Sequence, residues 1–365
     1  MGQRLAAVED VVDPSGAPNR DFWAKRRVLL TGHTGFKGAW AAVWLKQLGA
    51  HVTGFALPPQ GEPNLWREIG SDLIDEEIIG DLRDAAAVSK AVATAQSGIV
   101  LHMAAQSLVR ESYRHPVKTF ATNVMGTVHL LEALRNSSGL EAALIITTDK
   151  VYANKEQARD FVEDDPLGGH DPYSASKAAA EIATASYAQS FFQQRAICIA
   201  TARAGNVIGG GDWSTDRLVP DVWRAAAKGE SVVLRHPDAT RPWQHVLEPL
   251  AGYFLYLEAL ARGARVPPAL NFGPIGSAKV SEVAEAVGRA LGVDRPWLQS
   301  EEPGPREMQY LSLDPTKAQE ALGWKPRLSA GEAIRWTADW YAARDRGSDP
   351  LALCRSQIER YEALQ

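Results

Sequence analysis

The sequence predicts an α/β protein, in which a doubly wound parallel sheet is followed by a smaller substrate-binding lobe in the C-terminal third. From Arg26 onward, short aliphatic runs alternate with amphipathic stretches, which is typical of parallel strands joined by helices. A glycine-rich turn joins the first aliphatic run to the first helical stretch. After Arg203 the alternation gives way to segments interrupted by Gly and Pro, and such loops often carry specificity.

The individual elements follow from these patterns. Short, mostly apolar runs close to a Gly, Asp or Ser predict strands over residues 27–31, 51–55, 77–79, 99–102, 143–147 and 196–200. Helical spacing of apolar residues predicts helices over residues 37–48, 84–95, 116–135, 174–192, 247–262, 279–291, 316–322 and 330–346. We therefore expect a nucleotide-binding domain of residues 23–205 and 243–273, a second lobe of residues 206–242 and 274–345, and tails of residues 1–22 and 346–365.

Composition limits the classes of partner. The 365 residues are 45% hydrophobic and 23% charged, as in ordinary globular proteins. Acidic residues outnumber basic ones by 44 to 39, so there is no basic excess to bind nucleic acid or an anionic membrane, and we expect neither as a partner. Two cysteines suggest no disulfide framework and no metal site. Because no signal-like or membrane-spanning apolar run is present, a cytoplasmic protein is expected.

The glycine turn is the first candidate binding site. It reads Gly-His-Thr-Gly-Phe-Lys-Gly over residues 32–38. Glycine is needed where the backbone turns tightly, approaches a pyrophosphate or packs a helix closely on a strand. The following helix N-terminus offers free amide donors and a positive dipole to phosphates. A turn of no special purpose is the alternative, but the flanking strand and helix favour a dinucleotide site made by Gly32, Thr34, Gly35, Phe36 and Gly38.

The end of the second strand bears on the choice of dinucleotide. An acid that binds the adenosine ribose is expected there, roughly twenty residues after the turn. Residues 55–59 instead read Phe-Ala-Leu-Pro-Pro, which is a departure from the fingerprint. No Arg stands in this stretch for a 2′-phosphate either, so the sequence favours NAD over NADP as cofactor.

A tyrosine and a lysine are the first candidate catalytic pair. Tyr173 and Lys177 are four residues apart and fall on one face of an alanine-rich helix. A phenol with a pKa of about 10 is a poor base at neutral pH, and a nearby ammonium lowers that pKa. Such a tyrosine can take a proton from an alcohol while hydride leaves the same carbon. A surface pair is the alternative, but the position after a nucleotide-binding half favours the catalytic interpretation.

A second catalytic group closes the strand predicted over residues 143–147. Thr148, Asp149 and Lys150 stand at its carboxyl end, where ligands bind in parallel α/β sheets. Thr148 can hydrogen-bond the oxygen that is oxidised, and Asp149 and Lys150 add an acid and a base that a simple reductase does not need. A solvated Asp-Lys turn is the alternative.

These motifs resemble the extended short-chain dehydrogenase/reductase family, whose Rossmann domain carries a Thr-Gly-x-x-Gly-Phe-x-Gly turn. Residues 148–150 resemble the nucleotide-sugar 4,6-dehydratases of that family, which carry Thr-Asp-Glu or Thr-Asp-Lys at this point. The 4-epimerases carry small residues there. Within this group, the chain most resembles the branch that acts on CDP-glucose. The resemblance lies in the segments 35–38, 148–150, 203–213, 241–246 and 322–326. The resemblance runs from about Phe22 to Tyr341 and leaves out only the two tails.

The resemblance implies a three-step reaction. Tyr173, assisted by Lys177 and Thr148, deprotonates the sugar 4-hydroxyl while hydride passes to NAD. Removal of the C5 proton and protonation of the 6-hydroxyl, for which Asp149 is the candidate acid, then expel water. Hydride returns to C6 and gives the 4-keto-6-deoxy sugar. Lys150 is either the C5 base, if its pKa is depressed toward neutrality, or a cation that stabilises the enolate.

Further contacts are also implied by the resemblance. On the cofactor side they are Asp81 (to the adenine amine), Leu82, His102, Ala104, Ala105 and Asn123, together with Tyr173 and Lys177. Turn-and-cap, structural-histidine and buried-amide roles are the alternatives for Asp81, His102 and Asn123. On the nucleotide-sugar side they are Gln106, Arg203, Asn206, Arg241 and Arg306.

Two other functions remain open at this level. A nucleotide-sugar 4-epimerase or reductase would use Tyr173 and Lys177 and leave Asp149 and Lys150 idle. A regulatory protein that binds a cofactor without turnover would not need the proton-transfer set. Family habit and small-residue packing of the helices at 116–135 and 174–192 also imply a homodimer.

Overall fold

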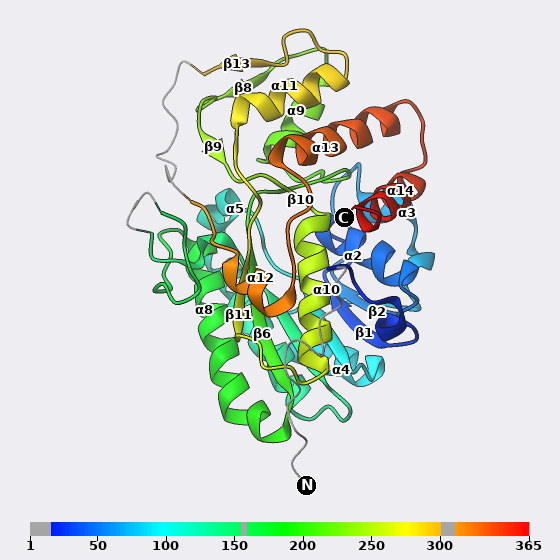
Figure 1. The fold of residues 1–365 in the computed structure, drawn as a ribbon, viewed down its shortest axis with the longest axis vertical. Coiled ribbons are helices and arrows are strands. Elements are labelled where there is room, and N and C mark those ends of the chain that lie inside the picture. The colour runs from blue at the N-terminus through cyan, green and yellow to red at the C-terminus, as the bar shows by residue number, and fades with distance from the viewer. Residues whose placement is uncertain (1–15, 155–158, 301–310, 365) are drawn as a thin grey trace.

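A seven-stranded parallel sheet forms the centre of the computed structural model, which describes residues 16–154, 159–300 and 311–364 (Figure 1). The strand order is β11-β6-β5-β4-β1-β2-β3. The strands are β1 (Arg27–Thr31), β2 (His51–Ala56), β3 (Glu76–Ile79), β4 (Ile99–His102), β5 (Ala142–Ile146), β6 (Cys198–Ala204) and β11 (Ala269–Phe272). All six pairings are parallel, which confirms the predicted doubly wound sheet.

The strand order reverses between β1 and β4. The chain runs outward from β1 to β3 and then returns to β4 on the other side of β1. Thr31, the last residue of β1, is level with Phe55 of β2 and His102 of β4. A crevice forms outside the carboxyl ends of strands at such a switch point, and this is where α/β sheets bind ligands.

Helices cover both faces of the sheet. On one face α2 (Phe36–Gln47) and α10 (Leu247–Ala261) are buried along almost their whole length, as expected for helices that are apolar all round. Trp40 and Trp44 of α2 are fully buried in this layer. The other face is covered by α4 (Ala85–Ala95), α7 (Gly126–Arg135) and α8 (Pro172–Tyr187). The shorter helices are α1 (Arg20–Trp23), α3 (Leu65–Ile69), α5 (Val109–Arg114), α6 (Pro116–Phe120) and α12 (Thr316–Leu322).

The second lobe lies beyond the carboxyl ends of the strands, at the top of Figure 1. Its helices are α9 (Leu218–Ala226), α11 (Val280–Ala290) and α13 (Ala330–Asp345), which pack on one another. Three two-stranded pairings complete it: β7 (Val207–Ile208) with β10 (Gln244–His245), β9 (Thr240–Arg241) with β12 (Ala278–Lys279), and β8 (Val232–Leu234) with β13 (Trp297–Gln299).

The structure differs from the sequence prediction in several elements. The strand expected over 196–200 begins at Cys198 and ends at Ala204, because Ala196 has a left-handed backbone with φ of 56°. A π-helical turn, Ala121–Met125, divides the helix expected over 116–135 into α6 and α7. The strand β11 and the helix α9 were not foreseen.

The C-terminal segment assigned to a tail forms a helix instead. α14 (Pro350–Glu362) packs against α2, α3 and α13. Trp44 donates its indole N–H to the Glu362 carboxylate at 2.8 Å, and the Tyr361 hydroxyl donates to Glu248 at 2.7 Å. Residues 350–362 therefore belong to the folded core.

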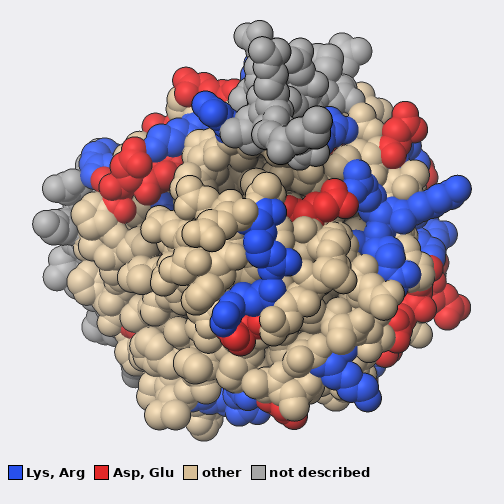
Figure 2. All heavy atoms as spheres, turned by 90° about the horizontal axis from the view of Figure 1, so that it is seen from below, with Lys and Arg blue, Asp and Glu red and all other residues tan. Residues whose placement is uncertain are grey.

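The surface and the helices limit what else the chain presents. Figure 2 shows Lys and Arg side chains interspersed with Asp and Glu side chains and broad neutral areas on the face seen from below. Within the described residues, no helix is both long and apolar enough to cross a bilayer. Over the same residues, no cluster of three His, Cys, Asp or Glu side chains is arranged to hold a metal ion.

Candidate active site

The glycine turn lies between β1 and α2, at the switch point of the sheet. Gly32 has a φ of 82°, and a Cβ there would lie 2.7 Å from the backbone nitrogen of Ala104. A Cβ on Gly38 would lie 2.1 Å from the Gly32 carbonyl oxygen. Gly35 is exposed at the N-cap of α2, and a Cβ there would make only an ordinary contact. Gly32 and Gly38 thus close the turn, while Gly35 leaves the helix N-terminus open to a phosphate.

Behind the turn, Thr31 ties β1 to β4. Its hydroxyl lies 2.7 Å from His102 Nδ1 and accepts the backbone N–H of Met103 and of Ala104, both at 3.1 Å. His102 Nε2 lies 3.3 Å from the Thr127 hydroxyl. Burial lowers the pKa of His102 to about 3, so the ring is neutral, and it joins Thr31 to Thr127.

The adenosine end of the site is arranged differently from a standard fingerprint. Thr34 donates to the Leu57 carbonyl at 2.9 Å, which closes the glycine turn against the end of β2. The carboxylate of Asp81 accepts hydrogen bonds from Arg83, which lowers its pKa. Asp81 is therefore an ionised carboxylate already held by Arg83, while Leu82 is buried beneath Gly126.

The Thr-Asp-Lys segment follows β5 at the same edge of the sheet. Asp149 is 1% exposed, and its Oδ1 accepts hydrogen bonds from the Thr148 hydroxyl and from Lys150 Nζ, both at 2.9 Å. Burial works to lower the pKa of Lys150, but the charge and hydrogen bond of Asp149 outweigh it, and the pKa is raised. The depressed lysine pKa that a C5 base requires is therefore not found in this state of the site, and Lys150 is an ammonium.

The predicted tyrosine and lysine both face this segment from α8. The Tyr173 hydroxyl is hydrogen-bonded to Thr148, and both side chains are buried. Burial raises the pKa of Tyr173, and Lys150 is the cation that opposes this most. Lys177 instead donates to the Ile146 carbonyl at 2.9 Å, and burial lowers its pKa to about 8. Lys150, and not Lys177 as expected, is therefore the lysine whose charge lowers the pKa of Tyr173.

Asn123 braces α8 against the loop after β4. Its amide nitrogen donates to the Ser176 hydroxyl and to the Gln106 carbonyl, both at 2.9 Å, and its oxygen accepts the Gln106 N–H at 2.8 Å. The Gln106 side chain is used within its own loop, where it donates to Thr119 and to the Leu108 carbonyl. Asn123 thus orients the helix that carries Tyr173.

Of the residues expected to bind the nucleotide sugar, some lie at the site and one is buried elsewhere. Asn206 reaches the site, where its amide donates to Asp149 Oδ2 at 3.4 Å, and the charge of Arg241 acts on Lys150. Arg203 does not reach it: its side chain is buried, and its guanidinium is held by the Glu181 carboxylate and the Tyr152 hydroxyl. Arg306 lies outside the described residues.

Sequence reasoning missed Lys37, although it stands inside the glycine turn. Its Nζ lies 5.6 Å from the centre of the Tyr253 ring. Burial, Arg217 and Lys177 lower the pKa of Lys37 to about 7, and Asp149 opposes them. The glycine spacing could have directed attention to this position, because a cation at the start of a helix N-terminus is unfavourable unless an anion is present.

Arg217, in the loop before α9, was also missed. It forms an ion pair with Asp212 at 3.1 Å and reaches the Ser107 hydroxyl at 3.4 Å. Its charge acts on both Tyr173 and Lys37, so the second lobe contributes a cation to the site. Nothing in the local sequence distinguishes this arginine from a surface residue.

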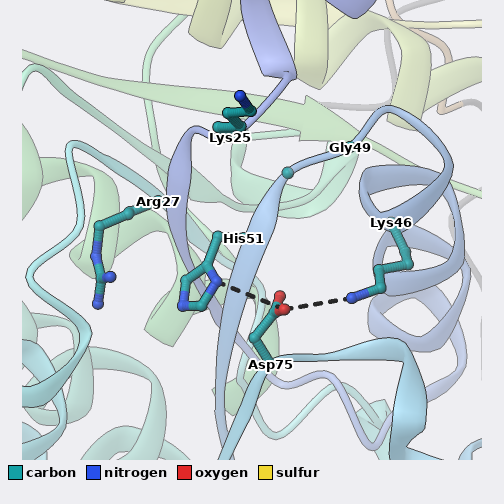
Figure 3. Close-up of a pocket in the computed structure, with 7 residues that line it drawn as sticks. Lys25, Arg27, Lys46, Gly49, His51 and Asp75 are labelled. Atoms are coloured by element: carbon teal, nitrogen blue, oxygen red, sulfur yellow. Dashed lines mark hydrogen bonds and ion pairs between the residues drawn. The ribbon is translucent and has the colours of Figure 1, made fainter.

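A separate hollow lies at the opposite end of the sheet, where β1 and β2 begin. It is about 460 Å³ and is lined by Lys25, Arg27, Lys46, Gly49, Ala50, His51 and Asp75. Lys46 and His51 both point at Asp75 (Figure 3), at 3.3 and 3.5 Å. The lysine also lies in the last turn of α2, where the helix dipole favours a cation. Asp75 is thus paired within the hollow, and the strand carboxyl ends remain the candidate active site.

A glycine turn at the switch point, with a threonine, a tyrosine and a lysine gathered at the ends of β5 and α8, defines a nucleotide-cofactor-dependent oxidoreductase-type enzyme of the extended short-chain dehydrogenase/reductase class. Residues 29–337 match the family model described as GDP-mannose 4,6 dehydratase. The chain therefore belongs to this family of nucleotide-sugar 4,6-dehydratases.

Individual relatives agree with this assignment. A CDP-glucose 4,6-dehydratase of Salmonella typhimurium is 42% identical over 351 residues, covering 94% of this chain and 98% of the relative. A dTDP-glucose 4,6-dehydratase of Xanthomonas campestris is 29% identical, covering 86% and 92%. The crystal structure of a Thermus thermophilus UDP-glucose 4-epimerase in complex with NAD is 27% identical with a TM-score of 0.74, covering 88% of this chain and 99% of that one.

Proposed function

We propose that the chain is an NAD-dependent CDP-glucose 4,6-dehydratase, which converts CDP-glucose to CDP-4-keto-6-deoxyglucose and water. The observation that carries the proposal is the buried group made by Tyr173, Thr148, Asp149 and Lys150, because it combines an oxidation pair with a second acid and cation. The 42% identity to a CDP-glucose 4,6-dehydratase supports the choice of substrate.

The glycine turn fits NAD. Gly32 and Gly38 leave no room for side chains, and the exposed Gly35 leaves α2 amide groups accessible to a pyrophosphate. Leu57 stands where an NADP-specific site would place a cation. NAD held at this turn would supply the hydride acceptor for oxidation at C4 and the hydride donor for reduction at C6. The contacts predicted for Asp81, Leu82, Ala104, Ala105 and Asn123 remain part of this proposal.

Tyr173 takes the proton of the sugar 4-hydroxyl. Thr148 is hydrogen-bonded to the phenol and shares its position next to the reacting oxygen. Lys150 opposes the effect of burial on the phenol, so its charge stabilises the phenolate. Lys177, anchored on the Ile146 carbonyl, holds the nicotinamide ribose side of the site in place.

Asp149 and Lys150 carry the elimination. The Asp149 carboxylate takes up the C5 proton as the C5–C6 double bond forms and passes it to the departing C6 hydroxyl, so that the C5–H and C6–O bonds break, water leaves and the carboxylate is restored. The raised pKa of Lys150 favours the role of an ammonium that stabilises the enolate oxygen. Arg217, Arg241 and Arg306 are the proposed ligands of the substrate diphosphate, whereas the buried pairing of Arg203 with Glu181 removes it from this set.

Incubation with CDP-, dTDP-, UDP- and GDP-hexoses tests the function. We expect a 4-keto-6-deoxy product from CDP-glucose in preference to the others, with one oxygen of the substrate lost as water. A product that keeps all its oxygens and differs only at C4 would identify a 4-epimerase instead. Turnover of a dTDP or GDP sugar in preference to CDP-glucose would overturn the base assignment.

We also propose a homodimer. Exposed apolar side chains gather on α6, α8 and the turns that follow them: Val117 (82% exposed), Phe120 (39%), Met125 (46%), Ile182 (60%) and Phe191 (40%). Exposed apolar patches of this kind commonly mark an interface, and these helices pack side by side. Sedimentation should give a dimer, and the Val117→Glu, Ile182→Glu double variant should sediment as a monomer. A wild-type monomer would contradict the proposal.

We propose, finally, that the enzyme is cytoplasmic. Both cysteines of the chain, Cys198 and Cys354, are free thiols, and burial raises the pKa of each. Free buried thiols suit a reducing compartment. Fractionation of the producing cell would test this.

A further inference from the structure

The Asp149 carboxylate rests directly against a glycine. Its Oδ1 is held by Thr148 and Lys150, while its Oδ2 faces Gly205 and the Asn206 amide. A Cβ built on Gly205 would lie 1.9 Å from Asp149 Oδ2 and 2.1 Å from Asp149 Cγ. These distances are far shorter than van der Waals contact. The carboxylate therefore occupies the space that the Cβ of any other residue at position 205 would need.

The requirement at Gly205 is one of space and not of backbone conformation. Its φ lies outside the left-handed region, so an alanine could adopt its backbone. For comparison, a Cβ on Gly35 would lie 3.4 Å from its nearest neighbour, and one on Gly331 of α13 would meet nothing within 4 Å. The effect of an alanine at position 205 therefore depends on which neighbouring atoms move to make room for its methyl group.

The backbone at Gly205 is anchored, so the carboxylate must be what moves. The buried Gln244 side chain donates to the Gly205 carbonyl at 2.9 Å and to the Phe272 carbonyl at 3.0 Å. The Gln244 backbone N–H donates to the Asn206 carbonyl at 3.2 Å, next to the β7–β10 pairing. Asp149 has only two side-chain torsions, and rotating them breaks its contacts with Lys150 and Asn206.

We propose that Gly205 is a positioning residue for the elimination of water. The lack of a side chain at Gly205 leaves room for the Asp149 carboxylate in the position described above. In that position Oδ1 is paired with Lys150 and Oδ2 accepts a hydrogen bond from the Asn206 amide. This inference rests on the proposed function, because it assigns Asp149 to the departing C6 hydroxyl. Oxidation at C4 uses Tyr173, Thr148, the charge of Lys150 and the cofactor, and in the proposed reaction the Asp149 carboxylate transfers no proton in that step.

Gly205→Ala should therefore separate the two half-reactions. We expect the rate of C4 oxidation, followed by the absorbance of the reduced cofactor in a single turnover, to stay within about fivefold of wild type. The rate of water loss, followed by product mass after rapid quenching, should fall by about 100-fold, the cost of a misplacement of about 1 Å. Reduced cofactor and 4-keto-glucose nucleotide should accumulate together.

Two further variants make the result specific. Gly331→Ala is the matched control, because it adds the same methyl group in open space and should leave both rates unchanged. Asp149→Asn tests the route: if Gly205 acts through Asp149, the double variant should lose water no more slowly than Asp149→Asn alone. Fully additive losses in the double variant would overturn the proposal.

The remaining outcomes are also decisive. Equal loss of oxidation and elimination in Gly205→Ala, in a variant that melts as the wild type does, would overturn the positioning role. Wild-type elimination in Gly205→Ala would do the same. If Gly205→Ala does not fold, Asn206→Gly, which keeps the left-handed backbone at φ 50° and removes the 3.4 Å hydrogen bond to Asp149, must show the same selective slowing at saturating substrate. A wild-type protein that releases no water from CDP-glucose would contradict the proposed function itself, before any variant is compared.

Discussion

Lys150 Nζ lies 2.9 Å from Asp149 Oδ1, so the two side chains expected to act in elimination are paired with each other before substrate arrives. The pairing explains why the pKa of Lys150 is raised although the side chain is largely enclosed. It also means that a change at Asp149 removes the charge and the hydrogen bond that raise the pKa of Lys150.

Lys150→Met is expected to uncouple oxidation from C5 chemistry. Tyr173 and Thr148 remain, so reduction of the cofactor by CDP-glucose should stay measurable, while exchange of the C5 proton with deuterated solvent should be abolished. The exposed Lys228→Met is the control and should behave as wild type. C5 exchange at the wild-type rate in Lys150→Met would remove this lysine from the mechanism, both as base and as enolate-stabilising cation.

Tyr173→Phe is expected to block the first step. Removing the hydroxyl leaves Thr148 without its phenol partner and leaves no group at that position to accept the substrate proton. The rate of cofactor reduction should fall by about 10²- to 10⁴-fold, with little change in CDP-glucose affinity. Tyr113→Phe, at a 65% exposed tyrosine, should be silent. Oxidation within tenfold of wild type in Tyr173→Phe would point to another base.

The motifs that the sequence predicts well are local ones. The glycine turn and the Tyr-x-x-x-Lys pair each lie within seven consecutive residues, so spacing alone places their side chains relative to one another. The strand before Thr148 likewise brings the Thr-Asp-Lys segment to the edge where ligands bind. The structure places all three motifs at the carboxyl edge of the sheet, and their catalytic and binding roles stay predictions.

The roles that sequence could not predict depend on residues distant in the chain. Arg203 looks like a phosphate ligand until Glu181 is seen beside it, 22 positions away on α8. Gly205 looks like one more loop glycine until Asp149, from the turn after β5, is seen to fill the space where its Cβ would be. The identity of the cation nearest Tyr173 also depends on how β5 and α8 pack, which spacing within α8 does not determine.

Breaking the buried Arg203–Glu181 ion pair should lower the free energy of unfolding. Both side chains are 4% exposed, and Glu181 also accepts hydrogen bonds from the Thr147 and Thr201 hydroxyls. Glu181→Gln leaves a buried guanidinium without its counter-charge, so urea denaturation should show a loss of about 3–5 kcal/mol in the free energy of unfolding. Glu132→Gln, which removes an exposed pair with Arg135, should leave the urea midpoint unchanged.

The last prediction concerns Glu248, a buried carboxyl that joins α10 to the C-terminal helix. Its oxygens accept hydrogen bonds from the Leu328 N–H at 2.6 Å and the Tyr361 hydroxyl at 2.7 Å. Burial outweighs these donors and raises the pKa of Glu248 to about 7, compared with about 4.3 for an exposed glutamate. The folded protein therefore binds this proton more tightly than the unfolded chain does.

Stability should consequently fall as pH rises between about 4.3 and 7, because the folded state holds more protons than the unfolded state over that range. The loss from this group amounts to at most about 4 kcal/mol and is complete above pH 7. Glu248→Gln keeps the shape and the acceptor for Tyr361 without the titration, so its free energy of unfolding relative to wild type should rise from pH 5 to pH 8. Urea denaturation of both proteins at these two pH values measures this difference, and a constant difference would show that Glu248 has an ordinary pKa in the folded state.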